Sequence, residues 1–107
     1  MRLHDLMDRA VNEEAAAAIH KTVAETPGVK SVRDIRTRKM GDMIVADARI
    51  EVDATLTVEA GHNIAVEARR RVMQRHRALN LMTHVDPWKR PDLDHLAVLQ
   101  DERSPTG

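Results

Sequence analysis

The sequence contains no cysteine, phenylalanine or tyrosine, and its only tryptophan is Trp88. The lack of cysteine excludes disulfide bonds, thiolate metal ligands and thiol nucleophiles, and it fits a reducing, cytoplasmic location. Without Phe and Tyr, a hydrophobic core must be built from Ala, Val, Ile, Leu and Met. In a chain of 107 residues such a core is small, which favours association with a second copy of the chain.

Neither an excess of one charge nor a long apolar run is present. Lys plus Arg equals Asp plus Glu at 17 each, whereas domains that bind nucleic acid usually carry a basic excess, so we expect no nucleic-acid partner. The one basic cluster, between residues 69 and 77, is interpreted as a solvated helix face. No apolar run approaches the ~20 residues of a membrane-spanning helix, so we expect no direct membrane insertion. Charged residues within residues 1–20 argue against a signal peptide.

We divide the chain into three parts. Residues 1–11 are a lead-in segment, where apolar residues at helical spacing indicate a short helix or a connection from an upstream segment. Residues 12–87 are the folded domain. Residues 88–107 are rich in proline and polar side chains, and we expect them to form a flexible tail.

The first half of the domain is predicted to be a helix followed by a hairpin. Asn12 is the expected N-cap of the helix, and Thr26-Pro27-Gly28 ends it. Strands are predicted for residues 29–38, with an irregularity, and for residues 43–52. The turn at Met40-Gly41-Asp42 joins them.

The second half is predicted to be a helix and a third strand. Thr57 is the expected N-cap of a helix that runs to about His76. The strand covers residues 79–86, with one side formed by Leu79, Leu81, Thr83 and Val85. The order helix, strand, strand, helix, strand predicts an α+β fold, a two-layer αββαβ sandwich that is ferredoxin-like but lacks the first strand.

No enzyme motif is present, so we do not expect an enzyme. The most informative polar pair is His84 and Asp86, which are two apart on a strand and therefore share a face. Imidazole and carboxylate groups are ligands for first-row divalent cations. Asp47 lies on the polar side of the second strand and meets His84 if the strands pair suitably. His62 lies in the first turn of the second helix.

Each of these residues also has a simpler interpretation. His84, Asp86 and Asp47 fit an exposed polar strand face, and His62 fits a surface histidine near a helix start. Arg33 and Arg49 are positioned for ordinary cross-strand salt bridges with acidic residues.

A series of short segments, in order from residue 6 to residue 88, carries a family resemblance. The segments are Leu6-Met7-Asp8-Arg9-Ala10-Val11, Thr26-Pro27-Gly28-Val29, Val32-Arg33-Asp34-Ile35-Arg36-Thr37-Arg38 with Gly41, Ile50-Glu51-Val52-Asp53, Val58-Glu59-Ala60-Gly61-His62 and Leu81-Met82-Thr83-His84-Val85-Asp86-Pro87. Together they resemble the cytoplasmic C-terminal domain of the cation diffusion facilitator (CDF) transporter family, or a free-standing relative of it.

The resemblance implies a metallochaperone-like αββαβ domain that forms a V-shaped homodimer below a membrane transporter domain. It also implies that divalent transition metals (Zn, Fe or Mn) bind at the dimer interface and in each arm and favour the closed dimer. By position, His62, His84 and Asp86 match metal ligands of the family. Asp47 matches a ligand position of its magnetosome-type members.

The sequence departs from this pattern at two positions. Zinc and iron exporters of the family have histidine where Arg33 and Arg49 stand, and a guanidinium group cannot ligate a metal. Three hypotheses therefore remain. The chain is a regulatory metal-binding homodimerisation domain of a cation efflux transporter at the inner face of the membrane, a metal-independent dimerisation module in which the arginines replace the cation, or a free-standing cytosolic metal carrier. The family's membrane helices are absent from these residues, which fits either an excised domain or a free-standing relative.

Overall fold

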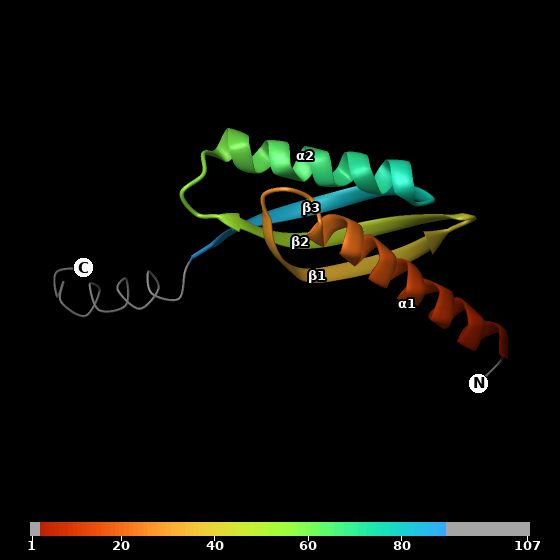
Figure 1. Cartoon of the computed structure of the whole chain (residues 1–107). Coiled ribbons are helices and arrows are strands. Elements are labelled where there is room, and N and C mark those ends of the chain that lie inside the picture. The colour runs from red at the N-terminus through yellow and green to blue at the C-terminus, as the bar shows by residue number, and fades with distance from the viewer. Residues whose placement is uncertain (1–2, 90–107) are drawn as a thin grey trace, which may run out of the picture.

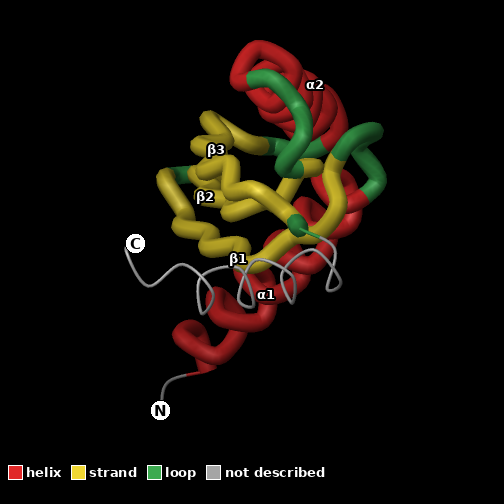
Figure 2. The backbone as a smooth tube through the Cα atoms, turned by 90° about the vertical axis from the view of Figure 1, so that its left-hand side faces the viewer, coloured by secondary structure: helices red, strands yellow, loops and turns green. Residues whose placement is uncertain are grey.

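The computed structural model describes residues 3–89, with side chains from residue 12 onward. The elements are α1 (Leu3–Ala24), β1 (Val29–Met40), β2 (Met43–Asp53), α2 (Val58–Arg75) and β3 (Ala78–Trp88) (Figure 1). β2 is the central strand, antiparallel to β1 and parallel to β3. Both helices lie on the same side of the sheet (Figure 2). The predicted two-layer αββαβ fold is confirmed.

The hairpin of β1 and β2 forms as its sequence predicts. Met40 pairs with Met43, and Gly41 between them has a φ of 63°, a left-handed conformation that glycine adopts without strain. The predicted irregularity of β1 is present as register shifts between Val29 and Ser31 and between Val32 and Asp34. Each shift inserts an extra residue, which bends and twists the strand.

The core lies between the sheet and the two helices, and its hydrophobic side chains are aliphatic, with Thr22 and Thr26 buried beside them. Alternate residues of β2 point into it, and Ala46, Ala48 and Ile50 are fully buried. The helices and the outer strands complete the cluster with Ile19, Val23, Ala68, Val72, Ala78 and Leu81. Because alanine occupies the centre of β2, the helices can approach the sheet closely. The predicted composition of the core is therefore correct.

Two contacts fix the helices to the rest of the fold. Gly28 has a φ of 94°, and a Cβ atom added there would lie 2.5 Å from Cδ1 of Ile64 on α2. At the other end of α2, a hydrogen bond of 2.7 Å joins Nε2 of His76 to Oγ1 of Thr22 on α1. Burial, with a smaller contribution from Arg75, lowers the pKa of His76 below 6.5.

The predicted cap of α2 is confirmed, since Oγ1 of Thr57 accepts a hydrogen bond of 3.0 Å from the amide of Ala60. The predicted cap at Asn12 is wrong, because α1 begins at Leu3 and passes through Asn12 without a break. No proline or glycine separates the lead-in from the Ala-rich segment, so helix propensity continues across Asn12 at a cost below about 0.7 kcal/mol.

The third strand differs from its prediction at one end. Ile44 pairs with Ala78 and Val45 with Asn80, so Leu79 is the extra residue at a register shift. Leu79 is 48% exposed instead of sharing the buried face with Leu81. The strand extends to Trp88, and the predicted tail beyond residue 89 lies outside the described residues. No helix among residues 3–89 has the length and hydropathy needed to cross a bilayer.

Candidate metal centre

The candidate ligands lie mostly on the side of the sheet opposite α1 and α2, which we call the open face. Residue pairing aligns three rows across it. The rows are Arg36, Asp47 and Met82; Asp34, Arg49 and His84; and Ser31, Glu51 and Asp86. This order follows from strand alternation, which sends every second side chain of β2 away from the core.

Asp47 and His84 border the same hollow in the open face. The hollow has a volume of about 460 Å³ and is lined by Arg33, Asp34, Arg36, Asp47, Ala48, Arg49 and His84. Asp47 and His84 come from neighbouring strands that pair in parallel. The strand pairing that sequence reasoning left conditional therefore brings this acid and this histidine to the lining of one hollow.

Asp86 shares the open face with His84, as the spacing of two on a strand predicts. Its Oδ2 lies 3.7 Å from Nε of Arg49, and the two side chains are 45% and 58% exposed. An ion pair this exposed contributes about 0–1 kcal/mol. Arg49 therefore neutralises the charge of Asp86 only weakly.

Glu51 is a further acid of the open face that sequence reasoning did not select. It is the β2 partner of Asp86, it accepts a hydrogen bond from the hydroxyl of Ser31, and its Oε1 lies 3.9 Å from Nη1 of Arg33. Asp47, Arg49 and Glu51 are alternate residues of β2, and this spacing indicated that Glu51 points to the same face as the other two. The pairing with Asp86 depends on the register of two parallel strands, which the sequence does not reveal.

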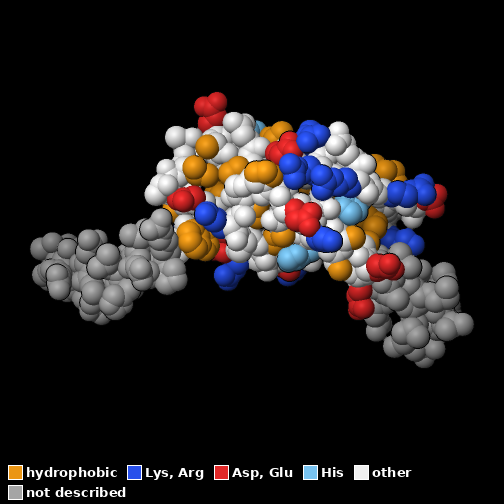
Figure 3. Space-filling view, in the orientation of Figure 1, with side chains coloured by type: hydrophobic (Ala, Val, Ile, Leu, Met, Phe, Trp, Pro, Cys, Tyr) orange, Lys and Arg blue, Asp and Glu red, His pale blue; other side chains and the backbone are white. Residues whose placement is uncertain are grey.

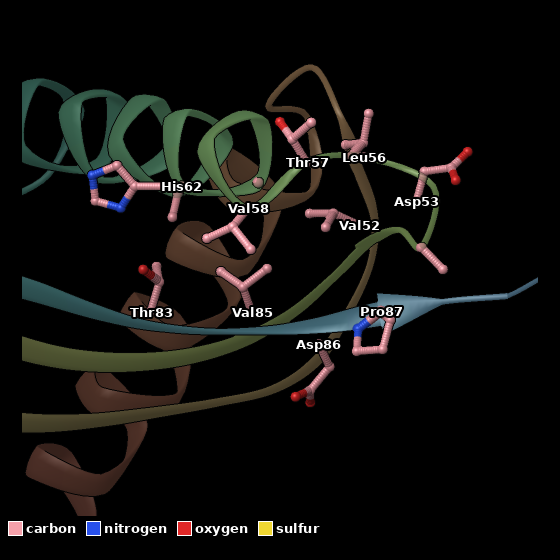
Figure 4. Close-up of a pocket in the computed structure, with 13 residues that line it drawn as sticks. Val52, Asp53, Leu56, Thr57, Val58, His62, Thr83, Val85, Asp86 and Pro87 are labelled. Carbon is pink, nitrogen blue, oxygen red and sulfur yellow. The ribbon is translucent and has the colours of Figure 1, made fainter.

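His62 does not border the hollow that Asp47 and His84 share. It projects from α2 beside a groove between α2 and β3 whose lining also includes Asp86, but the carboxylate of Asp86 points to the opposite side of β3 (Figure 4). Among the described side chains, no three His, Cys, Asp or Glu residues lie close enough to hold one ion. The donor types fit a first-row divalent cation, but the described side chains of a single protomer supply an incomplete set.

The sequence matches known proteins in its central part. Residues 11–88 match the family model described as "Cation efflux protein, cytoplasmic domain". The chain is 28% identical over 85 residues to the Cation-efflux pump FieF of Serratia proteamaculans (strain 568) and 29% identical over 85 residues to that of Cronobacter sakazakii (strain ATCC BAA-894). These matches cover 79% of this chain and 28% of each relative. The chain thus spans under a third of the length of these curated relatives.

Solved structures with the same fold agree with this match. A MamM-CTD variant has a TM-score of 0.70 at 28% identity, covering 73% of this chain and 95% of that one. A nickel form of MamM CTD has a TM-score of 0.69 at 28% identity, covering 72% of this chain and 99% of that one. A manganese form has a TM-score of 0.68 at 31% identity, covering 71% and 98%.

These findings confirm the resemblance drawn from the short sequence segments, and they agree with the predicted cytoplasmic location. The family is one of cation efflux proteins and not of enzymes. This chain belongs to the family of cytoplasmic domains of cation efflux proteins.

Proposed function

We propose that this domain is a regulatory homodimerisation domain of a cation efflux transporter, in which divalent cations on the open face favour a closed, V-shaped dimer. The observation that carries the proposal is the position of Asp47, His84 and Asp86 on one face of the sheet. Neutral imidazole and carboxylate groups suit Zn, Fe or Mn. The nickel and manganese forms of MamM CTD support a divalent transition metal as the ligand.

The incomplete ligand set supports a dimer. Zinc sites usually have four ligands, and the described residues of one protomer contain no cluster of three. A second protomer related by twofold symmetry offers the same groups again. A cation that bridges two protomers favours the closed dimer by the difference between its affinities for the closed and the open states.

Each candidate residue has a specific role in this proposal. His84 and Asp86 bind the cation from β3, and the cation replaces Arg49 at the carboxylate of Asp86. Asp47 contributes a second carboxylate across the hollow. His62, which lies on the other side of β3 (Figure 4), must be supplied by a second protomer.

Calorimetric titration of the full chain with Zn²⁺ or Mn²⁺ at pH 7.5 tests the two β3 ligands. We expect His84→Ala and Asp86→Asn each to weaken binding about tenfold or more, since each removes one direct ligand. His20→Ala on α1 and Asp42→Asn in the hairpin turn are the matched controls and should titrate like the wild type. If His84→Ala binds the cation as tightly as the wild type, His84 is not a ligand.

A mixing experiment tests whether His62 comes from the second protomer. His62→Ala and His84→Ala chains each lose the tight sites when alone. In an equal mixture, half of the dimers are mixed and each mixed dimer has one intact site, so about a quarter of the wild-type tight sites should return. If no tight site returns after subunit exchange, His62 does not complete the site across the dimer.

A metal-independent dimerisation module is the second candidate, favoured by the ion pairs of the two arginines. Arg49 lies beside Asp86 and Arg33 beside Glu51, so a positive charge already faces each acid. This alternative predicts a dimer that neither chelator nor added cation changes and that Arg33→Ala weakens. Sedimentation velocity with EDTA and with added Zn²⁺ separates it from the first proposal, which predicts a cation-dependent change in shape.

A further inference from the structure

The positive charges of the domain are concentrated at one end of the fold, which contains the hairpin tip, the second half of α2 and the start of β3. This end, residues 36–48 and 67–82, carries eight Lys or Arg and three Asp or Glu. The rest of the sheet and of α2 carries four Lys or Arg and five Asp or Glu, in residues 29–35, 49–66 and 83–89. Lys and Arg side chains show over the second half of α2 and beside the hairpin tip (Figure 3). A chain of zero net charge therefore has a positive end.

Hydrogen bonds between elements bring the cations of this end together. Lys39 at the end of β1 pairs with Ile44, whose amide donates a hydrogen bond of 3.0 Å to the carbonyl of Arg77, two residues after α2. Nε of Arg69 on α2 donates a hydrogen bond of 3.1 Å to Oδ1 of Asn80 on β3. The exposed cations of this region, which we call the basic end, are Arg38, Lys39, Arg69, Arg75 and Arg77.

The cations of the basic end make no ion pair with any described side chain. Glu67, an acid on the same half of α2, is engaged by two other arginines. In the opposite half of the fold, by contrast, Arg49 lies beside Asp86, and Nζ of Lys30 lies 5.2 Å from the ring centre of Trp88. Exposed cations that lack a counter-charge on the protein produce a positive potential that attracts an anionic partner.

The first helix starts at the same end. Oγ1 of Thr37 donates a hydrogen bond of 3.4 Å to the carbonyl of Asn12. The backbone of residues 3–11 continues from there past the hairpin, and the start of α1 projects beyond the sheet (Figure 1). In the proposed function, sequence upstream of α1 connects the domain to a transporter in the membrane, so the basic end faces the bilayer. The inference below rests on that proposed function.

We propose that the basic end binds the anionic phospholipid headgroups of the inner leaflet by electrostatic contact. The cytoplasmic leaflet is negatively charged, and each Lys or Arg near its surface strengthens binding by about fivefold. An acidic peptide is the competing partner, and it fits a groove better than a convex end. The five cations line neither the hollow of the open face nor the groove beside His62, and they come from three elements, which suits a broad lipid surface.

Co-sedimentation of the full chain with vesicles tests the proposal, at low salt and with EDTA so that no divalent cation bridges protein and lipid. We expect binding to vesicles of phosphatidylcholine with phosphatidylglycerol and none to phosphatidylcholine alone. The double substitution Lys39→Glu with Arg77→Glu should weaken binding at least about tenfold. Lys30→Glu with Lys89→Glu changes the net charge equally at the opposite end, and this matched control should weaken binding less than about threefold.

A milder pair of substitutions, Lys39→Gln with Arg77→Gln, should weaken binding at least about fivefold and replaces the charge reversal if circular dichroism shows that the reversal unfolds the domain. Three outcomes overturn the proposal. Equal sedimentation with both kinds of vesicle means that the basic end is only a solvated surface. Equal weakening by the two charge reversals means that net charge and not this end controls binding. Binding to poly-glutamate but not to vesicles assigns the end to an acidic peptide.

The lipid test and the cation test fail independently. Lys39→Glu with Arg77→Glu changes no candidate metal ligand, so its calorimetric titration with Zn²⁺ should match that of the wild type. Loss of vesicle binding with an unchanged titration therefore concerns the basic end alone. A wild type that binds anionic vesicles but no cation would instead contradict the proposed cation response of the open face.

Discussion

The two faces of β2 have opposite physical characters although their residues alternate along a single strand. Ala46, Ala48 and Ile50 point toward the helices and are fully buried. Asp47 and Arg49 point to the open face and are exposed. The comparison shows how one strand serves two purposes, since burial of one face stabilises the fold while the other face contributes little to stability and is available for binding.

The two faces of β2 differ in how much their interactions contribute to the free energy of unfolding. Fully burying a large aliphatic side chain contributes about 1.5–3 kcal/mol, whereas an exposed ion pair such as that of Arg49 with Asp86 contributes about 0–1 kcal/mol. Substitutions on the helix side should therefore change stability, and substitutions on the open face should change binding.

The largest effect is expected in the core. Ile50→Ala leaves a cavity under the helices and should lower the free energy of unfolding by about 2–5 kcal/mol, measured by urea denaturation. Arg49→Ala on the same strand is the matched control and should change the free energy by less than about 1 kcal/mol. Equal effects of the two substitutions would contradict the division between the faces.

Replacing each of two glycines by alanine should change the stability of the domain in opposite directions. Gly28→Ala should destabilise the domain by about 1–3 kcal/mol, because the residue has a positive φ and the new Cβ would clash with Ile64. Gly61→Ala should stabilise it by up to about 1 kcal/mol, since the site is helical and its nearest side-chain atoms lie at 3.7 and 3.8 Å. Thermal unfolding of both variants measures the difference, and a stable Gly28→Ala variant would refute the packing of this turn against α2.

On the open face, Arg49→Ala should strengthen cation binding while leaving the fold intact. A divalent cation and a guanidinium about 6 Å apart in water repel by about 1.4 kcal/mol, which corresponds to about tenfold in affinity. Titration calorimetry at low salt measures the change, with Arg38→Ala at the hairpin end of β1 as the matched control. Weaker binding in Arg49→Ala would instead assign the arginine a supporting role.

The smallest effect is expected from the contact between α1 and α2. Because burial lowers the pKa of His76, the unfolded chain binds its proton more readily than the folded one. Stability should therefore rise with pH between the lowered pKa and 6.5, and the contribution of His76 should be constant below that range, where both states are protonated, and above it, where both are neutral. Urea midpoints from pH 5 to pH 8 should flatten in His76→Gln, while His20→Ala keeps the wild-type slope.

Local sequence signals predicted the elements well. The alternation in β2, the cap at Thr57 and the turn at Gly41 each rest on residues close together in the chain, and all three are present. The predicted cap at Asn12 was wrong because a good capping residue does not stop a helix when favourable residues precede it. The prediction that Leu79 shares the side of Leu81 was wrong because a register shift arises from the pairing of two strands and not from one strand's pattern.

The candidate site was harder to predict because much of it depends on how the strands and helices are arranged in space. The shared face of His84 and Asp86 follows from strand geometry alone, so the sequence was sufficient. The pairing of Glu51 with Asp86 depends on parallel register, and the separation of His62 from Asp86 depends on which side of β3 the helix covers. These are properties of the three-dimensional arrangement, which short-range patterns do not determine.

Small-angle X-ray scattering of the full chain during titration with Zn²⁺ or Mn²⁺ tests whether the cation closes the dimer. We expect the mass of a dimer and a radius of gyration that falls as the cation is added, with no fall in Asp86→Asn. A wild-type radius of gyration that stays constant through saturating cation would contradict cation-driven closure and leave a dimer held together without metal.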